Sequence, residues 1–294
     1  MNEKYNYLTP ENINNFIDTA FSEDVGDGDH SSLSAIPAET TRKARLIIKD
    51  EGIIAGLALA KMIFKRADAN LQVNLLLNDG DTVKFGDIGL IVEGSARSIL
   101  TAERLVLNCM QRMSGIATAA KQAVKQTKGT TTKILDTRKT TPNCRIIEKW
   151  AVQIGGAVNH RFGLFDMIML KDNHVDYAGG VQNAIESAKV YRDRYYAKTG
   201  KHLRIEVETR NLVEVQEALN TGGVDVIMLD NMDIATTKSA VTIIRNSKNN
   251  CEIEASGGIT LEKIAEIAAC GIDYISIGAL THSVKSLDIS LKAY

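Results

Sequence analysis

The sequence has few cysteines and prolines, no charge imbalance and no long apolar run, and each shortage excludes a class of protein. The four cysteines form no CxxC pair, so we expect neither a disulfide framework nor a structural zinc site, and a reducing cytosol fits. Three prolines and no Ser/Gly-rich tract leave no candidate for a flexible linker. No apolar run reaches the roughly 18 residues that cross a bilayer, and the start lacks a basic-then-apolar signal, so no membrane is expected. The net charge of −1 disfavours nucleic acid as a partner.

The composition is that of a well-folded protein. Hydrophobic residues make up 44% and charged residues 24% of 294 residues, which argues against bulk disorder. The length suggests two domains or one large barrel. We therefore predict a cytoplasmic protein that acts on small molecules.

The first third of the chain predicts a small β-rich scaffold followed by a helix. Residues 10–22 have the apolar spacing of a short amphipathic helix, and residues 44–48, 71–77 and 88–92 are typical of strands. The acidic stretch 23–32 resembles a calcium loop, but no Glu stands twelve positions in, so a turn with helix caps is the better interpretation. A long helix is predicted from Ser98 past Met113.

From Lys133 onward, apolar runs alternate with helical stretches, which is typical of parallel β/α architecture. The predicted strands lie at 134–135, 167–170, 203–207, 226–229, 252–255 and 274–277. The predicted helices lie at 145–154, 180–196, 210–220, 233–246 and 260–269. Alternation alone does not separate a closed barrel from an open sheet.

Polar or permissive residues follow every one of these strands, at the edge where barrel enzymes collect catalytic groups. The basic members are Arg138, Lys139, His160, Arg161 and Lys171. Five cations on one rim of a nearly neutral protein indicate a ligand with more than one anionic group, such as a dicarboxylate or a phosphorylated sugar.

Acidic residues lie on the same rim. Glu206 and Glu208 are two apart on a strand and share its inner face, where we expect partners such as Lys139 or Lys171. For Glu206, mere neutralisation of a buried lysine is an equally good interpretation. Glu208 and Asp230 end neighbouring strands, where they could face a magnesium-bound ligand or positive charge on a sugar carbon.

Glycines follow the last two strands. Ser256-Gly257-Gly258 and Ile277-Gly278-Ala279 let backbone N–H groups approach a phosphate, as barrel enzymes often do there. No GxGxxG or GxxxxGK[ST] is present, so the Rossmann and P-loop interpretations lack their anchor. His174 is open to either a turn role or a ligand role.

These residues together resemble the quinolinate phosphoribosyltransferase family over nearly the whole chain. The matching phrases are Ala102-Glu103-Arg104, Ser114-Gly115-Ile116-Ala117-Thr118, Thr137-Arg138-Lys139-Thr140-Thr141-Pro142, Glu148-Lys149-Trp150-Ala151-Val152, Gly155-Gly156, Asn159-His160-Arg161, Lys171-Asp172-Asn173-His174, Glu206-Val207-Glu208, Leu229-Asp230-Asn231, Glu254-Ala255-Ser256-Gly257-Gly258-Ile259-Thr260 and Ile277-Gly278-Ala279-Leu280-Thr281-His282. Asn143-Cys144, Trp150 and Ala157 depart from the family's usual residues, but none of these departures removes a charged group.

The resemblance implies an α/β fold of two domains. An N-terminal α/β sandwich with the bridging helix would cover residues 1–115, and an irregular parallel β/α barrel would cover residues 116–294, with the last residues free to pack back on the first domain. It further implies a homodimer or hexamer with shared active sites. The implied reaction joins quinolinate to phosphoribosyl pyrophosphate with Mg²⁺, giving nicotinate mononucleotide, pyrophosphate and CO₂ in NAD biosynthesis.

The resemblance also implies residue roles by matching position. Quinolinate's two carboxylates would be held by Arg104, Arg138, Lys139, His160, Arg161 and Lys171. Glu208 and Asp230 would face the ribose and the magnesium carried by the sugar diphosphate, directly or through water. The 5′-phosphate and neighbouring oxygens would be held by Ser256, Gly257, Gly258, Gly278, Ala279 and His282. Thr137 and Ile277 complete the substrate-binding set, and the catalytic residues would be Lys139, Lys171, Glu208 and Asp230.

Other interpretations stay open. A Schiff-base aldolase would use Lys139 or Lys171. That mechanism needs a neutral lysine, but both lysines are expected to lie beside cationic and acidic residues. A paralogous phosphoribosyltransferase-like enzyme of molybdenum-transport clusters would act on another substrate. A non-catalytic pyridine-carboxylate sensor would bind without turnover and gives no reason for Glu208 and Asp230 beside a second anion site. Arg104 lies on the bridging helix, so we expect it to complete a partner subunit's pocket in a symmetric dimer.

Overall fold

The computed structural model describes residues 7–294, which form two compact units. Residues 122–138 and 158–278 make up the parallel-sheet unit. Residues 7–121, 139–157 and 279–294 make up the antiparallel-sheet unit. The division between the units first falls near the end of helix α4 (Ala96–Gln126), and the predicted domain boundary after residue 115 lies inside the same helix.

The antiparallel-sheet unit is built on four strands in the order β12-β1-β5-β3. These strands are β1 (Thr41–Ile48), β3 (Gln72–Leu75), β5 (Ile88–Ser95) and β12 (Ile289–Ala293). Leu46 lies opposite both Leu90 and Leu291, and all three are buried, so the last strand of the chain completes the core of this sheet. The short strands β2 (Gly52–Ile53) and β4 (Thr82–Val83) form a separate pair.

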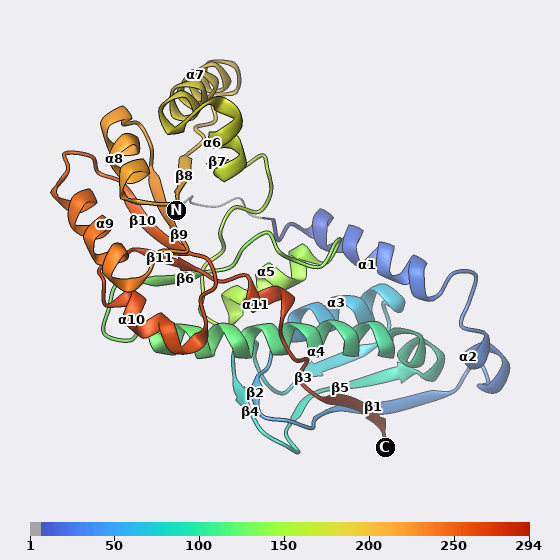
Figure 1. Cartoon of the computed structure of the whole chain (residues 1–294). Coiled ribbons are helices and arrows are strands. Elements are labelled where there is room, and N and C mark those ends of the chain that lie inside the picture. The colour runs from blue at the N-terminus through green and yellow to red at the C-terminus, as the bar shows by residue number, and fades with distance from the viewer. Residues whose placement is uncertain (1–6) are drawn as a thin grey trace. The chain divides into compact units, whose positions relative to one another are not determined.

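Helices α3 (Leu57–Ala67) and α4 lie on one side of this four-stranded sheet, as Figure 1 shows. The unit also contains α1 (Pro10–Asp24), α2 (His30–Ala35), α5 (Arg145–Ile154) and α11 (Ala279–His282). Asp29 caps α2 by accepting a hydrogen bond from the Ser32 backbone at 3.0 Å, which lowers the pKa of its carboxyl. The predicted turn with helix caps is therefore confirmed.

All four cysteines are free, as expected.

Six parallel strands form the second sheet, in the order β6-β11-β10-β9-β8-β7. Their bounds are β6 (Lys133–Leu135), β7 (Ile168–Leu170), β8 (Ile205–Thr209), β9 (Val226–Asp230), β10 (Glu252–Ser256) and β11 (Tyr274–Ser276). Each apolar run predicted as a strand overlaps one of them, so the predicted alternation is confirmed.

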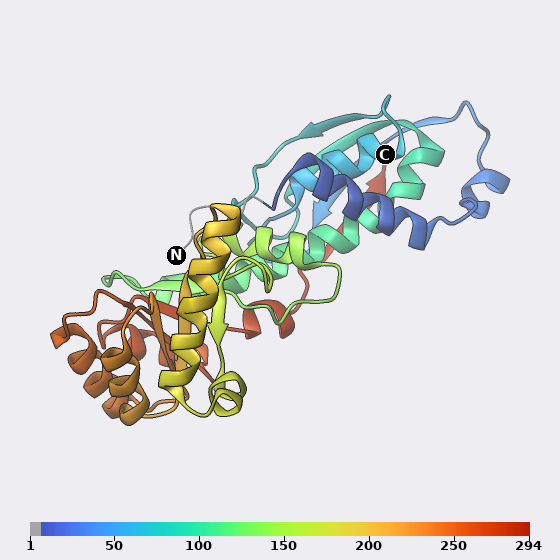
Figure 2. The same cartoon turned by 90° about the horizontal axis from the view of Figure 1, so that it is seen from above.

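Helices follow the parallel strands and pack against one another in chain order. They are α6 (Asp172–Ala178), α7 (Val181–Thr199), α8 (Leu212–Thr221), α9 (Ile234–Asn246), the 3₁₀ turn η1 (Leu261–Lys263) and α10 (Ile264–Ala268). Figure 2 shows α7, in yellow, beside the orange helices that follow it. None of the helices in the described residues is both long and apolar enough to cross a membrane.

The parallel sheet curls into an irregular barrel. Val158 bridges to Leu135 of β6, so a flat sheet would place the Val158 segment five strand spacings, about 24 Å, from β8. Instead, Nε2 of His160 lies 3.2 Å from a carboxylate oxygen of Glu206 on β8. Within residues 7–294 no ladder joins β6 to β7, which is why the barrel is irregular.

Candidate active site

The carboxyl ends of the parallel strands bring most of the predicted site residues to one edge of the parallel-sheet unit. This edge carries Thr137, Arg138, Arg161, Lys171, Glu208, Asp230, Ser256, Gly257, Gly258 and Gly278, directly after or at the ends of strands. The parallel ladder imposes this gathering, because every strand runs in the same direction.

Two arginines form the positive part of this edge. Arg161 is half-buried, and burial together with the charge of Arg138 lowers the pKa of its guanidinium, while Glu206 and Asp166 oppose that shift. Its Nη1 donates to the Met167 carbonyl at 3.4 Å. Two guanidinium groups close enough to repel each other are best compensated by an anion, and a planar carboxylate matches their geometry.

Asp136, fully buried directly after β6, determines the path of the loop that carries His160 and Arg161. Its carboxylate accepts hydrogen bonds from Asn159 Nδ2 at 2.6 Å and from the His160 backbone N–H at 2.8 Å. The cost of burying this charge is offset by these bonds. Asp136 was not among the predicted site residues, although its position directly after a strand could have marked it as a loop anchor.

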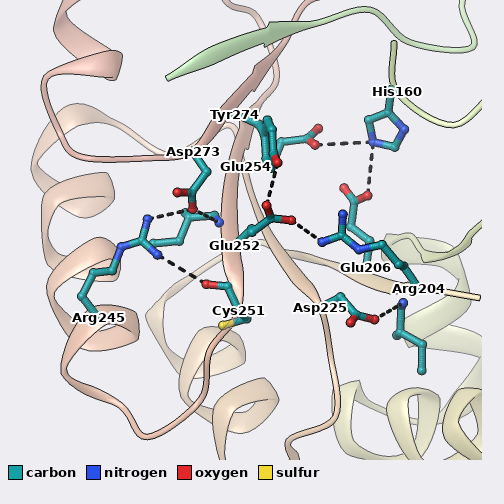
Figure 3. A network of polar contacts seen from close by, with 12 residues as sticks. His160, Arg204, Glu206, Asp225, Arg245, Cys251, Glu252, Glu254, Asp273 and Tyr274 are labelled. Atoms are coloured by element: carbon teal, nitrogen blue, oxygen red, sulfur yellow. Dashed lines mark hydrogen bonds and ion pairs between the residues drawn. The ribbon is translucent and has the colours of Figure 1, made fainter. Parts of the chain in front are cut away.

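The expected lysine partner of Glu206 is wrong, because the barrel interior places His160 there instead (Figure 3). His160 Nε2 lies 3.2 Å from Glu206 and 3.4 Å from Glu254, and all three residues are at most 7% exposed. Burial alone lowers the pKa of the imidazole, but the carboxylates of Glu254 and Glu206 outweigh it and raise the pKa to about 10. Its Nδ1 accepts from the Arg161 backbone at 2.7 Å. Both ring nitrogens of His160 therefore face protein groups.

Glu254 is the residue of this interior that sequence reasoning missed. It lies on β10 between the buried Ile253 and Ala255, on the face opposite to both, the same alternation that marked Glu206 on β8. Burial and the neighbouring Glu254 raise the pKa of Glu206. The ligand atoms of His160, Glu206 and Glu254 lie within 4.8 Å of one another, close enough for a metal ion.

Glu208 and Asp230 form the acidic part of the edge. Burial and then the charge of Asp230 raise the pKa of Glu208, whereas Lys171 and the Asp172 backbone N–H act to lower it. The charge of Lys171 therefore acts on Glu208, so a lysine partner, which was expected for Glu206 and Glu208, is found for Glu208. Two carboxylates that repel each other at neighbouring strand ends fit a divalent cation beside them.

The loop after β7 begins α6 with a histidine cap. His174 Nδ1 accepts a hydrogen bond from the backbone N–H of Lys171 at 2.9 Å. Of the two roles left open for His174, the structure favours the turn. The Lys171 side chain is exposed at the carboxyl edge.

The first glycine after β10, Gly257, is required by close packing. Gly257 has φ +93°, and a Cβ there would lie 2.3 Å from Oδ1 of Asn231, which itself has φ 53°. Asn231 also donates from Nδ2 to Asp230 at 2.7 Å and from its backbone to the Ser256 carbonyl at 2.9 Å. A cavity of about 410 Å³ opens beside this loop and the start of α9, lined in part by Ser256, Gly257 and Gly258.

Several predicted site residues belong to the antiparallel-sheet unit: Arg104, Lys139, Ala279 and His282. Arg104 is exposed on α4, and Lys139 and His282 are exposed as well. Thr281 Oγ1 donates to the Lys139 carbonyl at 2.8 Å, so the segments of Lys139 and His282 lie together within this unit. Ile277 is buried in the parallel-sheet unit, where its backbone donates to the Leu135 carbonyl at 2.9 Å.

A buried ion pair holds the same two segments and was not predicted. Arg112 on α4 donates to Glu148 on α5 from Nε at 3.1 Å and from Nη2 at 2.9 Å, and Nη2 also donates to the Thr281 carbonyl. Glu148 is fully buried and accepts from the Thr141 backbone at 3.1 Å. Helical spacing alone gave no reason to single out either residue.

The chain matches two domain models of one protein family. The N-terminal domain of quinolinate phosphoribosyl transferase matches residues 29–114, and the C-terminal domain matches residues 116–292. A nicotinate-nucleotide pyrophosphorylase [carboxylating] from rice is 47% identical over 291 residues, covering 94% of this chain and 76% of the relative. A probable enzyme of the same name from Bacillus subtilis is 44% identical over 271 residues, covering 92% of this chain and 90% of the relative.

Solved structures agree with the sequence relatives. NadC from Streptococcus pyogenes superposes with a TM-score of 0.88 at 41% identity and 97% coverage of both chains. The nicotinate-nucleotide pyrophosphorylase from Francisella tularensis superposes with a TM-score of 0.89 at 34% identity and 100% coverage of both chains.

Proposed function

Since the chain belongs to the quinolinate phosphoribosyltransferase family, we propose that it transfers the phosphoribosyl group of phosphoribosyl pyrophosphate to quinolinate with loss of CO₂. The products are nicotinate mononucleotide, pyrophosphate and CO₂, and the reaction serves NAD biosynthesis. The observation that carries this function is the pair of close guanidinium groups, Arg138 and Arg161, on the same strand edge as the acidic pair Glu208 and Asp230. One pair suits a dicarboxylate, and the other suits a sugar diphosphate with its metal.

Quinolinate binds through charge. Arg138 and Arg161 hold its carboxylates, with Lys171 on the neighbouring strand end, and Lys139 and Arg104 add two more cations. His160 contributes indirectly, because its ring nitrogens face Arg161, Glu206 and Glu254. Holding two anions that repel each other in one geometry is the main work of such a site.

Glu208 and Asp230 face the ribose and the metal. Burial and the charge of Asp230 raise the pKa of Glu208. A cation near both carboxylates would relieve the repulsion between them, so these residues fit Mg²⁺. When bound, Mg²⁺ neutralises charge on the diphosphate leaving group. The same carboxylates stabilise positive charge that develops on the ribose as pyrophosphate departs. The 5′-phosphate and its neighbouring oxygens are held by Ser256, Gly257, Gly258, Gly278, Ala279 and His282. Two further residues, Thr137 and Ile277, shape the pocket.

The bonds change at two places. The quinolinate nitrogen forms a bond to the ribose carbon as the bond from that carbon to pyrophosphate breaks. The cationic ring then accepts the electron pair of the adjacent carbon–carboxylate bond, CO₂ leaves, and the ring carbon takes a proton. We assign Lys139 and Lys171 the role of holding the carboxylates through these steps.

A turnover assay tests the function directly. The protein with Mg²⁺, phosphoribosyl pyrophosphate and quinolinate should give nicotinate mononucleotide and one CO₂ for each pyrophosphate, and nicotinate in place of quinolinate is the control. Product from nicotinate but not from quinolinate would overturn the substrate assignment.

The plant relative from rice is described as chloroplastic, so a cytoplasmic location stays a prediction that cell fractionation can check.

Arg104 supports a homodimer or hexamer with shared active sites. It is exposed on α4 in a unit other than that of Arg138 and Arg161, so a second subunit could use it. Mixing inactive Arg104→Ala subunits with inactive Lys171→Ala subunits should restore up to about a quarter of wild-type activity, because a heterodimer would regain one intact pocket. No recovery, with subunit exchange confirmed, would place Arg104 in its own subunit's site.

A further inference from the structure

Two segments of the antiparallel-sheet unit carry predicted substrate residues outside any sheet. Residues 139–144, which begin with Lys139, form neither helix nor strand, and His282 ends the four-residue helix α11. Both side chains are exposed, so packing in the core does not fix them. The position of such a segment depends on the hydrogen bonds that its peptide groups make. The bonds to these two segments therefore decide where Lys139 and His282 lie.

Thr281 joins the two segments through two separate groups. Its side chain is fully buried, and its Oγ1 donates a hydrogen bond to the Lys139 carbonyl at 2.8 Å. Its own carbonyl belongs to the peptide group that leads to His282, and it accepts from Nη2 of Arg112. Thr281 therefore holds the Lys139 backbone through its hydroxyl, and it carries His282 on a peptide group that Arg112 holds.

Arg112 completes the network from the other side. Its guanidinium donates to Oε1 of the fully buried Glu148 from Nε at 3.1 Å and from Nη2 at 2.9 Å. Oε2 of Glu148 accepts from the backbone N–H of Thr141, two residues after Lys139, at 3.1 Å. A planar guanidinium can bond to a carboxylate and to a carbonyl at the same time, in a fixed geometry. The network therefore returns to the segment that carries Lys139.

We propose that Thr281 and Arg112 are positioning residues that fix the separation between Lys139 and His282. This inference rests on the proposed function, in which Lys139 holds a quinolinate carboxylate and His282 holds the 5′-phosphate side of phosphoribosyl pyrophosphate. A bond forms between two bound substrates only when both are held in one geometry, and small misplacements slow the reaction. The Thr281 hydroxyl acts on the quinolinate side alone, whereas Arg112 acts on both sides.

Substitutions of Thr281 in the full-length protein test the role of the hydroxyl. Thr281→Val removes the hydroxyl and keeps the shape of the side chain. It should raise the KM for quinolinate about fivefold, the effect of one hydrogen bond, and change the KM for phosphoribosyl pyrophosphate by less than about twofold. Thr281→Ser keeps the hydroxyl and should bring the quinolinate KM within about twofold of the wild type. An equal rise in both KM values, or a serine variant as impaired as the valine variant, would overturn the proposal.

Thr132→Val is the matched control. Thr132 is buried, and its Oγ1 donates to the Ile272 carbonyl at 2.8 Å, the same distance as the bond from Thr281 to Lys139. This bond also joins segments far apart in the chain, but it lies at the amino edge of the parallel sheet. Thr132→Val should lower the melting temperature about as much as Thr281→Val does and leave both KM values unchanged. Identical kinetics of the two variants would mean that Thr281 only supports the fold.

Arg112→Lys tests the hold on both segments. It keeps a positive charge for the buried Glu148, but an ammonium group lacks the planar fork that bonds to Glu148 and the Thr281 carbonyl together. The KM values for quinolinate and for phosphoribosyl pyrophosphate should both rise about fivefold. A rise for quinolinate alone, or for neither substrate, would contradict the hold of Arg112 on His282. Thr281→Val leaves every charge in place and decides the proposal if Arg112→Lys does not fold.

Amide hydrogen exchange tests the same bond without any activity. Exchange in residues 139–144 should be about fivefold faster in Thr281→Val than in the wild type, because the segment opens more easily without the hydroxyl. Thr281→Ser and Thr132→Val should exchange there as the wild type does. Unchanged exchange in Thr281→Val would overturn the positioning role. If the wild type failed to turn over quinolinate, the proposed function would fall, while exchange would still decide whether Thr281 holds the Lys139 segment.

Discussion

Both edges of the parallel sheet carry charged residues, but they arrange them in opposite ways. At the amino edge, Glu252 pairs with Arg204 and accepts from the Tyr274 hydroxyl at 2.6 Å, and Arg245 pairs with Asp273 at 2.7 Å (Figure 3). At the carboxyl edge, the charge of Arg138 acts on Arg161 and the charge of Asp230 acts on Glu208, so like charges interact.

The pKa directions express the same contrast. Burial acts to raise the pKa of Glu252, but Tyr274 and Arg204 outweigh it and lower that pKa. Burial and Asp230 raise the pKa of Glu208. The amino edge pairs opposite charges and stabilises the fold, whereas the carboxyl edge brings like charges near one another, as is typical of an edge that binds charged ligands.

The largest expected effect is on the positive pair. Arg138→Ala or Arg161→Ala should reduce kcat/KM for quinolinate by an amount worth about 2–5 kcal/mol, because a buried carboxylate loses its charged partner. The KM for phosphoribosyl pyrophosphate should change far less. Arg245→Ala at the amino edge is the control and should lower stability while leaving both KM values alone. Equal weakening of both substrates would mean that the carboxyl-edge arginines only support the fold.

The second largest expected effect on activity comes from substitution of the acidic pair, Glu208 and Asp230. Glu208→Gln or Asp230→Asn should lower kcat about 100-fold, because the carboxylates stabilise charge that develops on the ribose side. Steady-state kinetics at saturating Mg²⁺ should show only a modest change in quinolinate KM. Normal turnover in either variant would make that carboxylate a counter-ion without a catalytic role.

The third expected effect comes from a substitution at Gly257, in the loop after β10, which would disturb the packing of that loop. Gly257→Ala places a Cβ 2.3 Å from Asn231 Oδ1 at a φ of +93°, so Asn231 and its bond to Asp230 must move. We expect a loss of about 1–3 kcal/mol in the free energy of unfolding and a higher KM for phosphoribosyl pyrophosphate. Gly129→Ala, also at positive φ but with nothing within 4 Å, is the control for backbone strain alone. Equal effects of the two variants would show that the contact with Asn231 does not matter.

The smallest effect concerns stability against pH and has opposite signs at the two edges. Glu208 ionises less readily in the folded state than in the unfolded state, because its pKa is raised. Glu208→Gln should therefore raise the free energy of unfolding at neutral pH by about 1 kcal/mol. Well below pH 4.5 the substitution should give no gain, because the carboxyl is protonated in both states. Glu252 ionises more readily when folded, so Glu252→Gln should lower stability at neutral pH by a similar amount. That loss should disappear as the pH falls through the lowered pKa of Glu252. Urea unfolding across acid to neutral pH measures both, and equal signs would contradict the contrast.

Much of the parallel-sheet unit could be predicted from the sequence because its signals are local. The alternation of apolar runs and amphipathic stretches located all six strands, and the polar residues after them marked the carboxyl edge. The partner of Glu206 could not be predicted, because His160 is far along the chain and reaches β8 only when the sheet curls. The Arg112–Glu148 pair was missed because only tertiary packing brings α4 and α5 together. Glu254 was missed although its strand shows the same alternation that marked Glu206.

The sequence by itself determined which residues are strands, which charges gather at the carboxyl edge, and which family the chain resembles, because periodicity, residue type and spacing are properties of neighbouring positions. Only the tertiary structure decided which charges meet. Whether a buried carboxylate finds an arginine, as Glu252 does, or another carboxylate, as Glu206 does, depends on strand order and curvature. Those features follow from the packing of the whole unit, and electrostatic energy depends on distance through space and not along the chain.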